Sequence, residues 1–135
     1  MLRPGGFLYE GWDQSDGESE DCRIQQKWKE ILAGRGYTLV RGRHQARLAE
    51  VERELIRLGL EPKARTVADW VELRSPRTSL EMLSERIYSF TWEVPEEVFR
   101  PSVAELTQWV AATYPDPDVE YPVHWKFVVR SSRMP

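Results

Sequence analysis

The sequence predicts an α/β fold in which helices separate three strands. Aromatic and apolar strand formers follow a Pro-Gly-Gly turn near the start of the chain. In the middle of the chain, an amphipathic helical pattern ends at Gly59 and an alternating segment follows it. The stretch from Val119 to Arg130 then alternates between an apolar and a mainly polar face. This pattern is typical of a strand with one buried side.

Composition limits the classes of protein to consider. The chain has 135 residues, 41% hydrophobic and 30% charged, which is ordinary for one globular domain. No run approaches the roughly 18 apolar residues of a membrane span, and the first residues lack a signal-peptide pattern, so we expect no membrane partner. The net charge of −3 argues against a nucleic-acid partner. Cys22 has no second cysteine to pair with, and a cytoplasmic protein is expected.

Residues 1–12 predict a turn followed by a strand. Pro4 fixes its own φ, and Gly5 and Gly6 can adopt the positive φ that a tight reversal requires. Phe7, Leu8 and Tyr9 are then strong strand formers.

Residues 13–47 predict a loop and a helix. The segment from Asp13 to Asp21 contains no apolar residue and is expected to be a solvated loop. From about Asp21 to Gly34 apolar residues recur at helical spacing. The expected buried face consists of Ile24, Trp28, Ile31 and Leu32.

The basic and histidine residues give no strong site. The segment from Arg41 to His44, with Arg35 and Arg47 nearby, could hold a phosphate, but a solvated helix entry is the preferred interpretation. His124 has no cysteine, aspartate or second histidine at ligand spacing. We therefore expect neither a metal site nor histidine-based catalysis, and no catalytic residue is assigned.

Residues 48–73 predict a helix and a strand. Leu48, Val51, Leu55 and Leu58 step along one helical face before Gly59. The period then changes to two over residues 64–73. Trp70, within this strand, is interpreted as a core aromatic rather than a pocket wall.

Residues 74–118 predict a helical insertion. Ser75 and Pro76 have the residue types of an N-cap and a first helical position, and Leu80, Leu83 and Ile87 would form the apolar face. Pro101 predicts a kink or a fresh helix start. The helix that follows runs through Tyr114, and its expected inward residues are Val103, Leu106, Trp109 and Val110.

The segment Tyr88-Ser89-Phe90-Thr91-Trp92 alternates rings with small hydroxyl residues. In an extended conformation it would present three rings to one side. Two interpretations stay open: a strap that covers the core, and one wall of a ligand pocket.

Several segments resemble class I S-adenosylmethionine-dependent methyltransferases. Leu2-Arg3-Pro4-Gly5-Gly6 before an apolar strand resembles the L-[KR]-P-G-G segment that enters the fifth strand of that family. Phe127-Val128-Val129-Arg130 resembles its final strand. The segment from Ser89 to Val98, with Leu106 to Trp109, is similar to the cap insertion of bacterial type 11 methyltransferases.

This resemblance implies a partial Rossmann-like methyltransferase sheet with helical cap insertions. The sheet would contain the family's last three strands, with the final antiparallel strand, residues 119–131, in the centre. The parent reaction is methyl transfer from S-adenosylmethionine to a small-molecule acceptor. The family's glycine-rich loop after its first strand and its acidic ribose ligand cannot be placed in this sequence. We therefore expect a C-terminal half that is inactive alone and does not bind the cofactor by itself.

The resemblance also suggests where an acceptor would bind. Trp12, Trp28, Tyr88 and Trp92 are expected to line the acceptor side. Trp12 is included because it would lie at the carboxyl end of the first strand, where open α/β sheets bind ligands. A complementary chain, or self-association through the first strand, is the expected protein partner. The alternative is a small α+β module that binds a ligand or protein and associates through its exposed strand edge.

Overall fold

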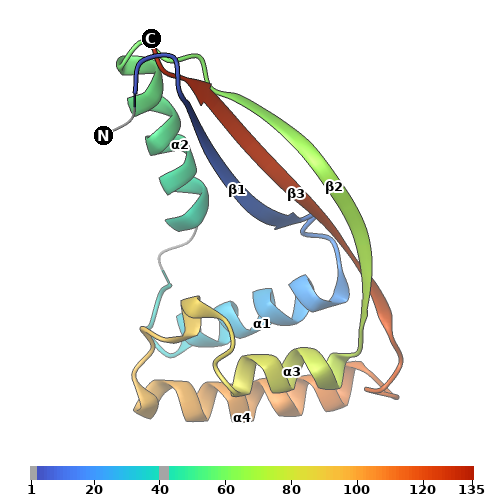
Figure 1. Cartoon of the computed structure of the whole chain (residues 1–135). Helices are drawn as coiled ribbons and strands as arrows, with labels where there is room; N and C mark the ends of the chain where they lie inside the picture. Colours follow the sequence, from blue (N-terminus) through green and yellow to red (C-terminus); the bar gives the residue numbers. More distant parts are fainter. Residues whose placement is uncertain (1–2, 40–42) are drawn as a thin grey trace. The chain divides into compact units, whose positions relative to one another are not determined.

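The computed structural model describes residues 3–39 and 43–135. Met1, Leu2 and residues 40–42 lie outside this description, so the first residues of the L-[KR]-P-G-G-like segment and part of the basic segment are not assessed. Along the chain the elements are β1 (Phe7–Ser15), α1 (Glu20–Gly34), α2 (Arg43–Arg57), β2 (Lys63–Arg74), α3 (Pro76–Ser84), the 3-10 helix η1 (Ser89–Thr91), α4 (Glu96–Thr113) and β3 (Tyr121–Arg133) (Figure 1).

In the described residues the strands form one three-stranded sheet of order β1-β3-β2. The register between β1 and β3 is constant, from Phe7 opposite Arg133 to Ser15 opposite Trp125. β3 is antiparallel to both neighbours, so β1 and β2 run parallel to each other (Figure 1). The α/β class and the central, antiparallel position of the final strand are therefore confirmed.

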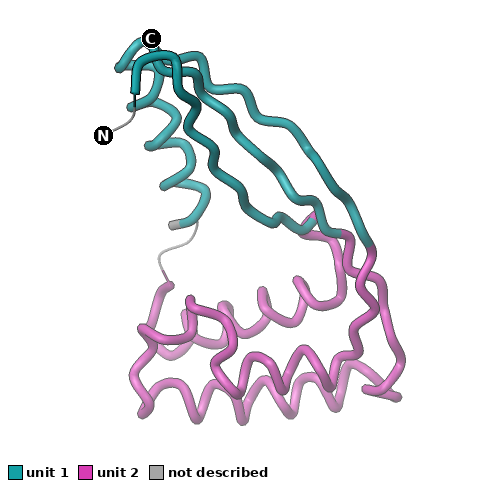
Figure 2. Tube along the Cα trace, in the orientation of Figure 1, with its two compact units in different colours: residues 1–15, 40–70, 125–135 teal, residues 16–39, 71–124 magenta. Residues whose placement is uncertain are grey.

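The chain divides into two compact units (Figure 2). Unit 1 comprises Met1–Ser15, Val40–Trp70 and Trp125–Pro135, and unit 2 comprises Asp16–Leu39 and Val71–His124. Unit 1 thus contains β1, α2 and most of β2 and β3, while unit 2 contains α1, α3 and α4.

The core of unit 2 lies among its helices. Ile24, Trp28, Ile31 and Leu32 of α1 are buried together with residues of α3 and α4, which confirms the predicted face of α1. The Ser19 side chain accepts a hydrogen bond from the Cys22 backbone N–H at 3.1 Å. This N-cap fixes the start of α1 and, with it, which residues face inward.

Helix α4 does not break at Pro101, so the expected fresh start is wrong, while a kink there stays a prediction. Pro101 lies inside a continuous helix from Glu96 to Thr113. The next residue, Ser102, donates to the Phe99 carbonyl at 2.6 Å and accepts from Trp28 Nε1 at 2.9 Å. This buried contact with α1 holds the helix in register where the proline removes a backbone hydrogen bond.

Strand β1 continues to Ser15, so the prediction that a loop begins at Asp13 is wrong. Asp13 and Gln14 lie opposite Phe127 and Lys126 of β3. Pairing with a neighbouring strand outweighs the weak strand propensity of these two polar residues.

Two further expectations about local structure are corrected. The segment at Tyr88 is not extended, because Ser89–Thr91 forms a 3-10 helix. Ile87 lies beyond the end of α3 and is exposed. Ser75 does cap α3, with its side chain 3.2 Å from the Thr78 backbone nitrogen, and Pro76 is the first helical residue, as predicted.

Several apolar residues of unit 1 are exposed against expectation. Trp70 is partly exposed and stacks on Trp125 with ring centres 6.3 Å apart, so it is not a core residue. The ring lies on the side of the sheet where Phe127 of the central strand is also exposed. Leu55 of α2 is buried, whereas Leu58, just beyond the helix end, is exposed.

The buried side of β3 changes along the strand, so the single apolar face predicted for it holds only in part. At the start of β3, Tyr121 packs against the core of unit 2 and Val123 is buried. Further along the strand Phe127 is partly exposed, and the buried residues beyond it are Arg130 and Ser132. Arg130 lies against α2, where its Nη1 donates to the Leu48 carbonyl at 2.9 Å.

We predict that Pro101→Ala raises the free energy of unfolding by about 1–3 kcal/mol. The alanine supplies the N–H that the helix interior lacks and removes the clash of the proline ring. Urea unfolding followed by circular dichroism measures the change. Pro95→Ala, at the N-cap of the same helix, is the control and should have little effect. A destabilised Pro101→Ala protein would contradict the prediction.

Candidate functional site

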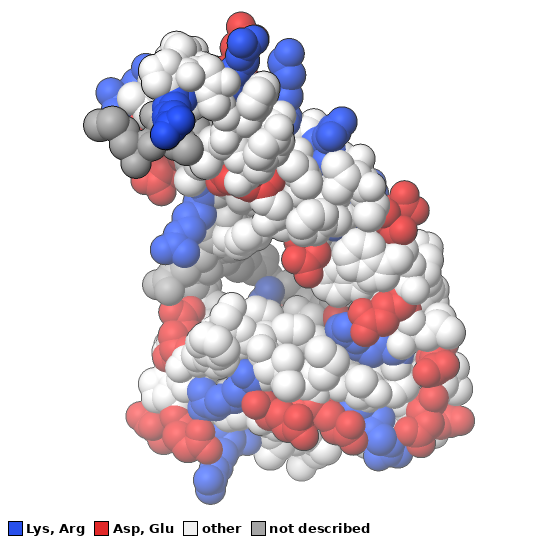
Figure 3. Space-filling view, in the orientation of Figure 1, with Lys and Arg blue, Asp and Glu red and all other residues white. Residues whose placement is uncertain are grey.

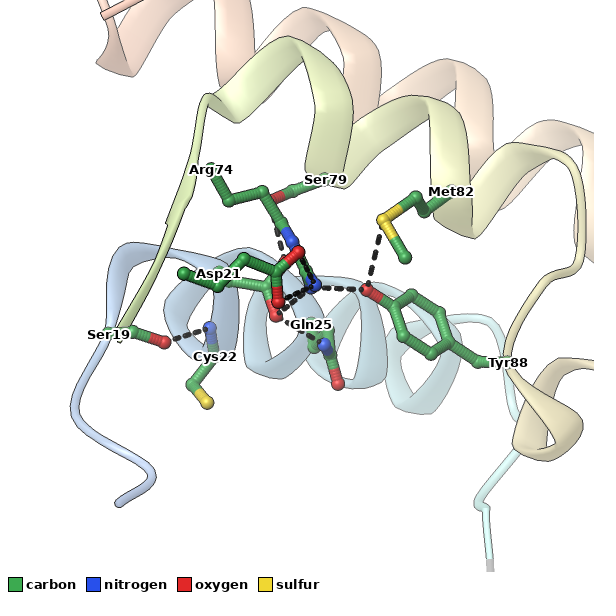
Figure 4. Close-up of polar contacts among 9 residues, drawn as sticks. Ser19, Asp21, Cys22, Gln25, Arg74, Ser79, Met82 and Tyr88 are labelled. Atoms are coloured by element: carbon green, nitrogen blue, oxygen red, sulfur yellow. Dashed lines mark hydrogen bonds and ion pairs between the residues drawn. The ribbon is translucent and has the colours of Figure 1, made fainter. Parts of the chain in front are cut away.

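The most extensive polar cluster of unit 2 centres on a buried ion pair. Arg74 ends β2 and Asp21 lies in the first turn of α1. Their side chains are 6% and 3% exposed, and Arg74 Nη1 is 3.1 Å from Asp21 Oδ2 (Figure 4). A charge removed from water to this extent requires a charged partner. The pair therefore couples the end of β2 to the start of α1.

The Asp21 carboxylate has hydrogen-bond donors from its own helix and from α3. Ser79 Oγ donates to Asp21 Oδ1 at 2.6 Å, and Gln25 Nε2 donates to Oδ2 at 2.8 Å (Figure 4). Both oxygens are thus occupied. The carboxylate therefore ties α1 to α3 and to the end of β2.

The Arg74 guanidinium has partners beyond Asp21. Nη2 donates to both Glu72 oxygens at 2.8 Å, and Nη1 donates to Tyr88 Oη at 3.1 Å. Arg74 Nε is buried and has no hydrogen-bond partner in the structure described. Burial alone lowers the pKa of Arg74, but the Glu72 hydrogen bond and the Asp21 charge raise it above its ordinary value. Arg74 therefore stays positively charged.

Tyr88 is the predicted site residue that belongs to this cluster. Its Oη accepts from Arg74 and lies 3.9 Å from Met82 Sδ (Figure 4). Burial, together with the Asp21 charge, raises the pKa of Tyr88 to about 12, although Arg74 acts in the opposite direction. The phenol is therefore neutral at ordinary pH and can donate or accept a hydrogen bond.

An aromatic row connects Tyr88 with Trp28, a second predicted site residue. Tyr88 stacks on Phe90 with ring centres 5.1 Å apart, and Phe90 is 6.0 Å from Trp28. Trp28 is completely buried and packs against the Phe90 ring from the core side. The structure therefore brings Tyr88 and Trp28 together.

Trp92 lies outside this row. Its side chain is 68% exposed, and its Nε1 donates to the Arg86 carbonyl at 2.7 Å. The 3-10 helix at Ser89–Thr91 turns the backbone, so the three rings do not share one side as an extended segment would require.

Trp12 belongs to unit 1, beside a second buried arginine. Arg130 is 2% exposed, and its guanidinium carbon is 5.5 Å from the centre of the Trp12 ring. Arg130 Nε donates to Glu10 at 2.8 Å, and Nη1 is 3.2 Å from Glu52. Trp12 Nε1 and Arg130 Nη2 are buried donors without an acceptor among the described residues.

Sequence reasoning missed both arginines. Arg74 follows the predicted alternating segment, and Arg130 falls on the polar face of the last strand, so neither was assigned a role. The sequence did contain one indication of a buried ion pair: each arginine belongs to a mainly apolar strand, and acidic residues occur on other predicted elements. Pairing partners such as Arg74 and Asp21 could not be identified from it, because they are far apart in the sequence.

Further properties of the described residues also bear on their function. No group of three or more histidine, cysteine, aspartate or glutamate side chains among them could hold a metal ion. Residues 3–39 and 43–135 also include no helix with the length and apolar character needed to cross a membrane. On the face shown in Figure 3, acidic and basic side chains are interspersed and do not form one large basic area.

No protein-family model matches the chain, and no curated protein matches it.

We predict that Arg74→Met lowers the free energy of unfolding by about 3–5 kcal/mol, because it leaves the buried Asp21 carboxylate without its cation. Chemical unfolding at neutral pH measures the loss. Arg77→Met is the matched control, since the Arg77–Asp118 pair is exposed and such pairs contribute little. Equal losses in the two variants would contradict a special role for the buried pair.

A second prediction concerns alkaline pH. The pKa of Tyr88 is higher in the folded chain than in the unfolded chain, so the neutral phenol stabilises the fold. This contribution is complete below the ordinary pKa of tyrosine, about 10, and is lost as the pH rises through about 12. The midpoint of urea unfolding, measured at several pH values in this range, should fall less steeply with rising pH for Tyr88→Phe than for the original chain. Identical slopes would contradict the assignment.

Proposed function

We propose that this chain is the C-terminal, substrate-capping part of a class I S-adenosylmethionine-dependent methyltransferase that acts on a small molecule. It is inactive alone, and the part that holds the methyl donor is outside the chain. The observation that carries this proposal is the strand order. The last strand, β3, lies between β1 and β2 and is antiparallel to both.

The turn before β1 supports the same proposal. The Gly6 N–H donates to the Arg3 carbonyl at 3.0 Å, and Gly5 has a φ of 77°. This positive φ explains why glycine is needed there. The residues of the family-like segment that are described thus form a tight turn into a strand, as the resemblance implies.

In this proposal, the helices of unit 2 form the substrate cap. They surround an aromatic row in which Tyr88 and Phe90 are partly exposed and Trp28 is buried. Acceptor pockets are mostly apolar, with a few polar groups that fix orientation, and the Tyr88 hydroxyl is such a group. Methyl transfer depends mainly on alignment of the acceptor atom with the donor, so the cap requires no reactive side chain.

The described residues do not fit S-adenosylmethionine itself. A nucleotide-type cradle places several glycines between a strand and the helix that follows. Between β1 and α1 the chain offers Gly17, flanked by the acidic residues Asp16 and Glu18. We therefore assign no step of donor binding to this chain.

Calorimetry with S-adenosylhomocysteine tests the proposal. We expect no micromolar binding by this chain. We also expect that the adjoining coding sequence contains a glycine-rich strand-turn-helix half, and that joining or co-expressing it with this chain produces binding.

Two results would contradict the proposal. Micromolar binding by the 135-residue chain would overturn the claim that the donor-holding part is missing. Absence of binding after the adjoining half has been supplied, in a sample shown by circular dichroism to be folded, would overturn the methyltransferase assignment.

A second candidate function is a small α+β binding module. It is favoured by the exposed rings of Phe7 and Tyr9, which stack on each other in β1 of unit 1. Exposed apolar groups that lie together commonly mark interaction sites. This candidate predicts binding of a ligand or protein without any donor-holding half.

A further inference from the structure

Within residues 3–39 and 43–135, the backbone of β1 is paired on one side only. β1 lies at an end of the strand order, next to β3. The Met134 N–H donates to the Gly6 carbonyl, and the Asp16 N–H donates to the His124 carbonyl. Even-numbered residues of β1 therefore exchange hydrogen bonds with β3, since antiparallel partners alternate in this respect. The backbone groups of Phe7, Tyr9, Gly11 and Asp13 point away from β3, and all four residues are exposed.

Charge distinguishes this edge from the opposite edge of the sheet. In unit 1, β2 has Lys63, Arg65 and Asp69 along its exposed length, and charges on an edge strand discourage pairing with other chains. β1 has two charged residues: Glu10, whose carboxylate is bound to Arg130 at 2.8 Å, and Asp13, which lies beyond the segment from Phe7 to Gly11. The edge of β1 is therefore open to another strand.

The side chains beside this edge are aromatic. Phe7 and Tyr9 are 52% and 64% exposed and stack on each other with ring centres 5.9 Å apart. Gly11 is the next residue on that side. The Phe127 ring occupies the space where a side chain at this position would lie, and it would be 2.6 Å from an added Cβ. An added strand could cover Phe7 and Tyr9 while its backbone pairs with the edge.

We infer that β1 pairs antiparallel with β1 of a second copy of this chain. A two-fold axis makes such an interface self-complementary. The backbone groups of Phe7, Tyr9 and Gly11 that face outward would bond to the same set in the partner, and the aromatic pairs of the two copies would adjoin on one side of a continuous sheet. The inference concerns this chain by itself, because the donor-holding half of the proposed transferase would extend the sheet at the same edge and compete with the second copy.

The size of the contact predicts a weak dimer. Each aromatic side chain presents about 150–250 Å², so the exposed parts of Phe7 and Tyr9 supply roughly 200 Å² per copy. A stable interface buries about 800 Å² per partner. The backbone pairing adds to the aromatic area but does not reach this value. Association should therefore depend on concentration over roughly the 10 µM to 1 mM range.

Sedimentation and amide exchange together test the inference. Sedimentation should show a monomer becoming a dimer as the concentration rises. By NMR, the amides of Leu8, Glu10 and Trp12 should be protected at every concentration, because they donate to β3. Those of Phe7, Tyr9 and Gly11 should gain protection only as the dimer forms.

The double variant Phe7→Lys, Tyr9→Lys should weaken dimerisation by about tenfold or more, because it places like charges side by side at the pairing edge. Ile56→Lys is the control, since Ile56 of α2 is similarly exposed and should leave dimerisation unchanged. A monomer at all concentrations would overturn the inference. So would a dimer that is insensitive to the double variant, or exposed-edge amides that remain unprotected in the original chain when the dimer is populated.

Discussion

The position of β3 between β1 and β2 is the constraint on which the rest of the fold depends. In the described sheet both other strands have β3 as their hydrogen-bonded neighbour. The backbone groups of a strand without such pairing bond only to water, and an isolated strand is not stable in the extended conformation. The pairing also explains why polar Asp13 and Gln14 are part of β1, since Phe127 and Lys126 of β3 lie opposite them.

A buried arginine with acidic partners occurs in each unit. Arg74 binds Asp21 and Glu72 in unit 2, and Arg130 binds Glu10 and Glu52 in unit 1. Buried ion pairs add little net stability relative to apolar packing, but an unpaired buried charge is costly. They therefore disfavour arrangements in which the arginine and its carboxylates are separated. Tyr88 and Trp12, two residues expected from the sequence at an acceptor site, are next to these arginines.

The periodicity of the sequence predicted those features of the fold that depend only on residues close together in the chain. Ile24, Trp28 and Leu32 were recognised as a buried face because helical spacing alone defines such a face. Ser75 was recognised as a cap for a similar reason. Contacts distant in sequence could not be predicted, such as the Trp28–Ser102 hydrogen bond that accompanies the continuous helix at Pro101. The exposure of Trp70 also depends on which side of the sheet is covered, and the pattern of a single strand does not specify this.

Cross-strand contacts between Hα protons, measured by NMR on the isolated chain, test the sheet order most directly. In the antiparallel pair, Tyr9 opposite Ser131 and Gly11 opposite Val129 are the positions without mutual hydrogen bonds, where the Cα atoms approach most closely, at about 4.5 Å. A central β3 predicts strong Hα–Hα signals at both pairs. Signals that pair β1 with β2 instead would contradict the sheet order and the functional proposal that depends on it.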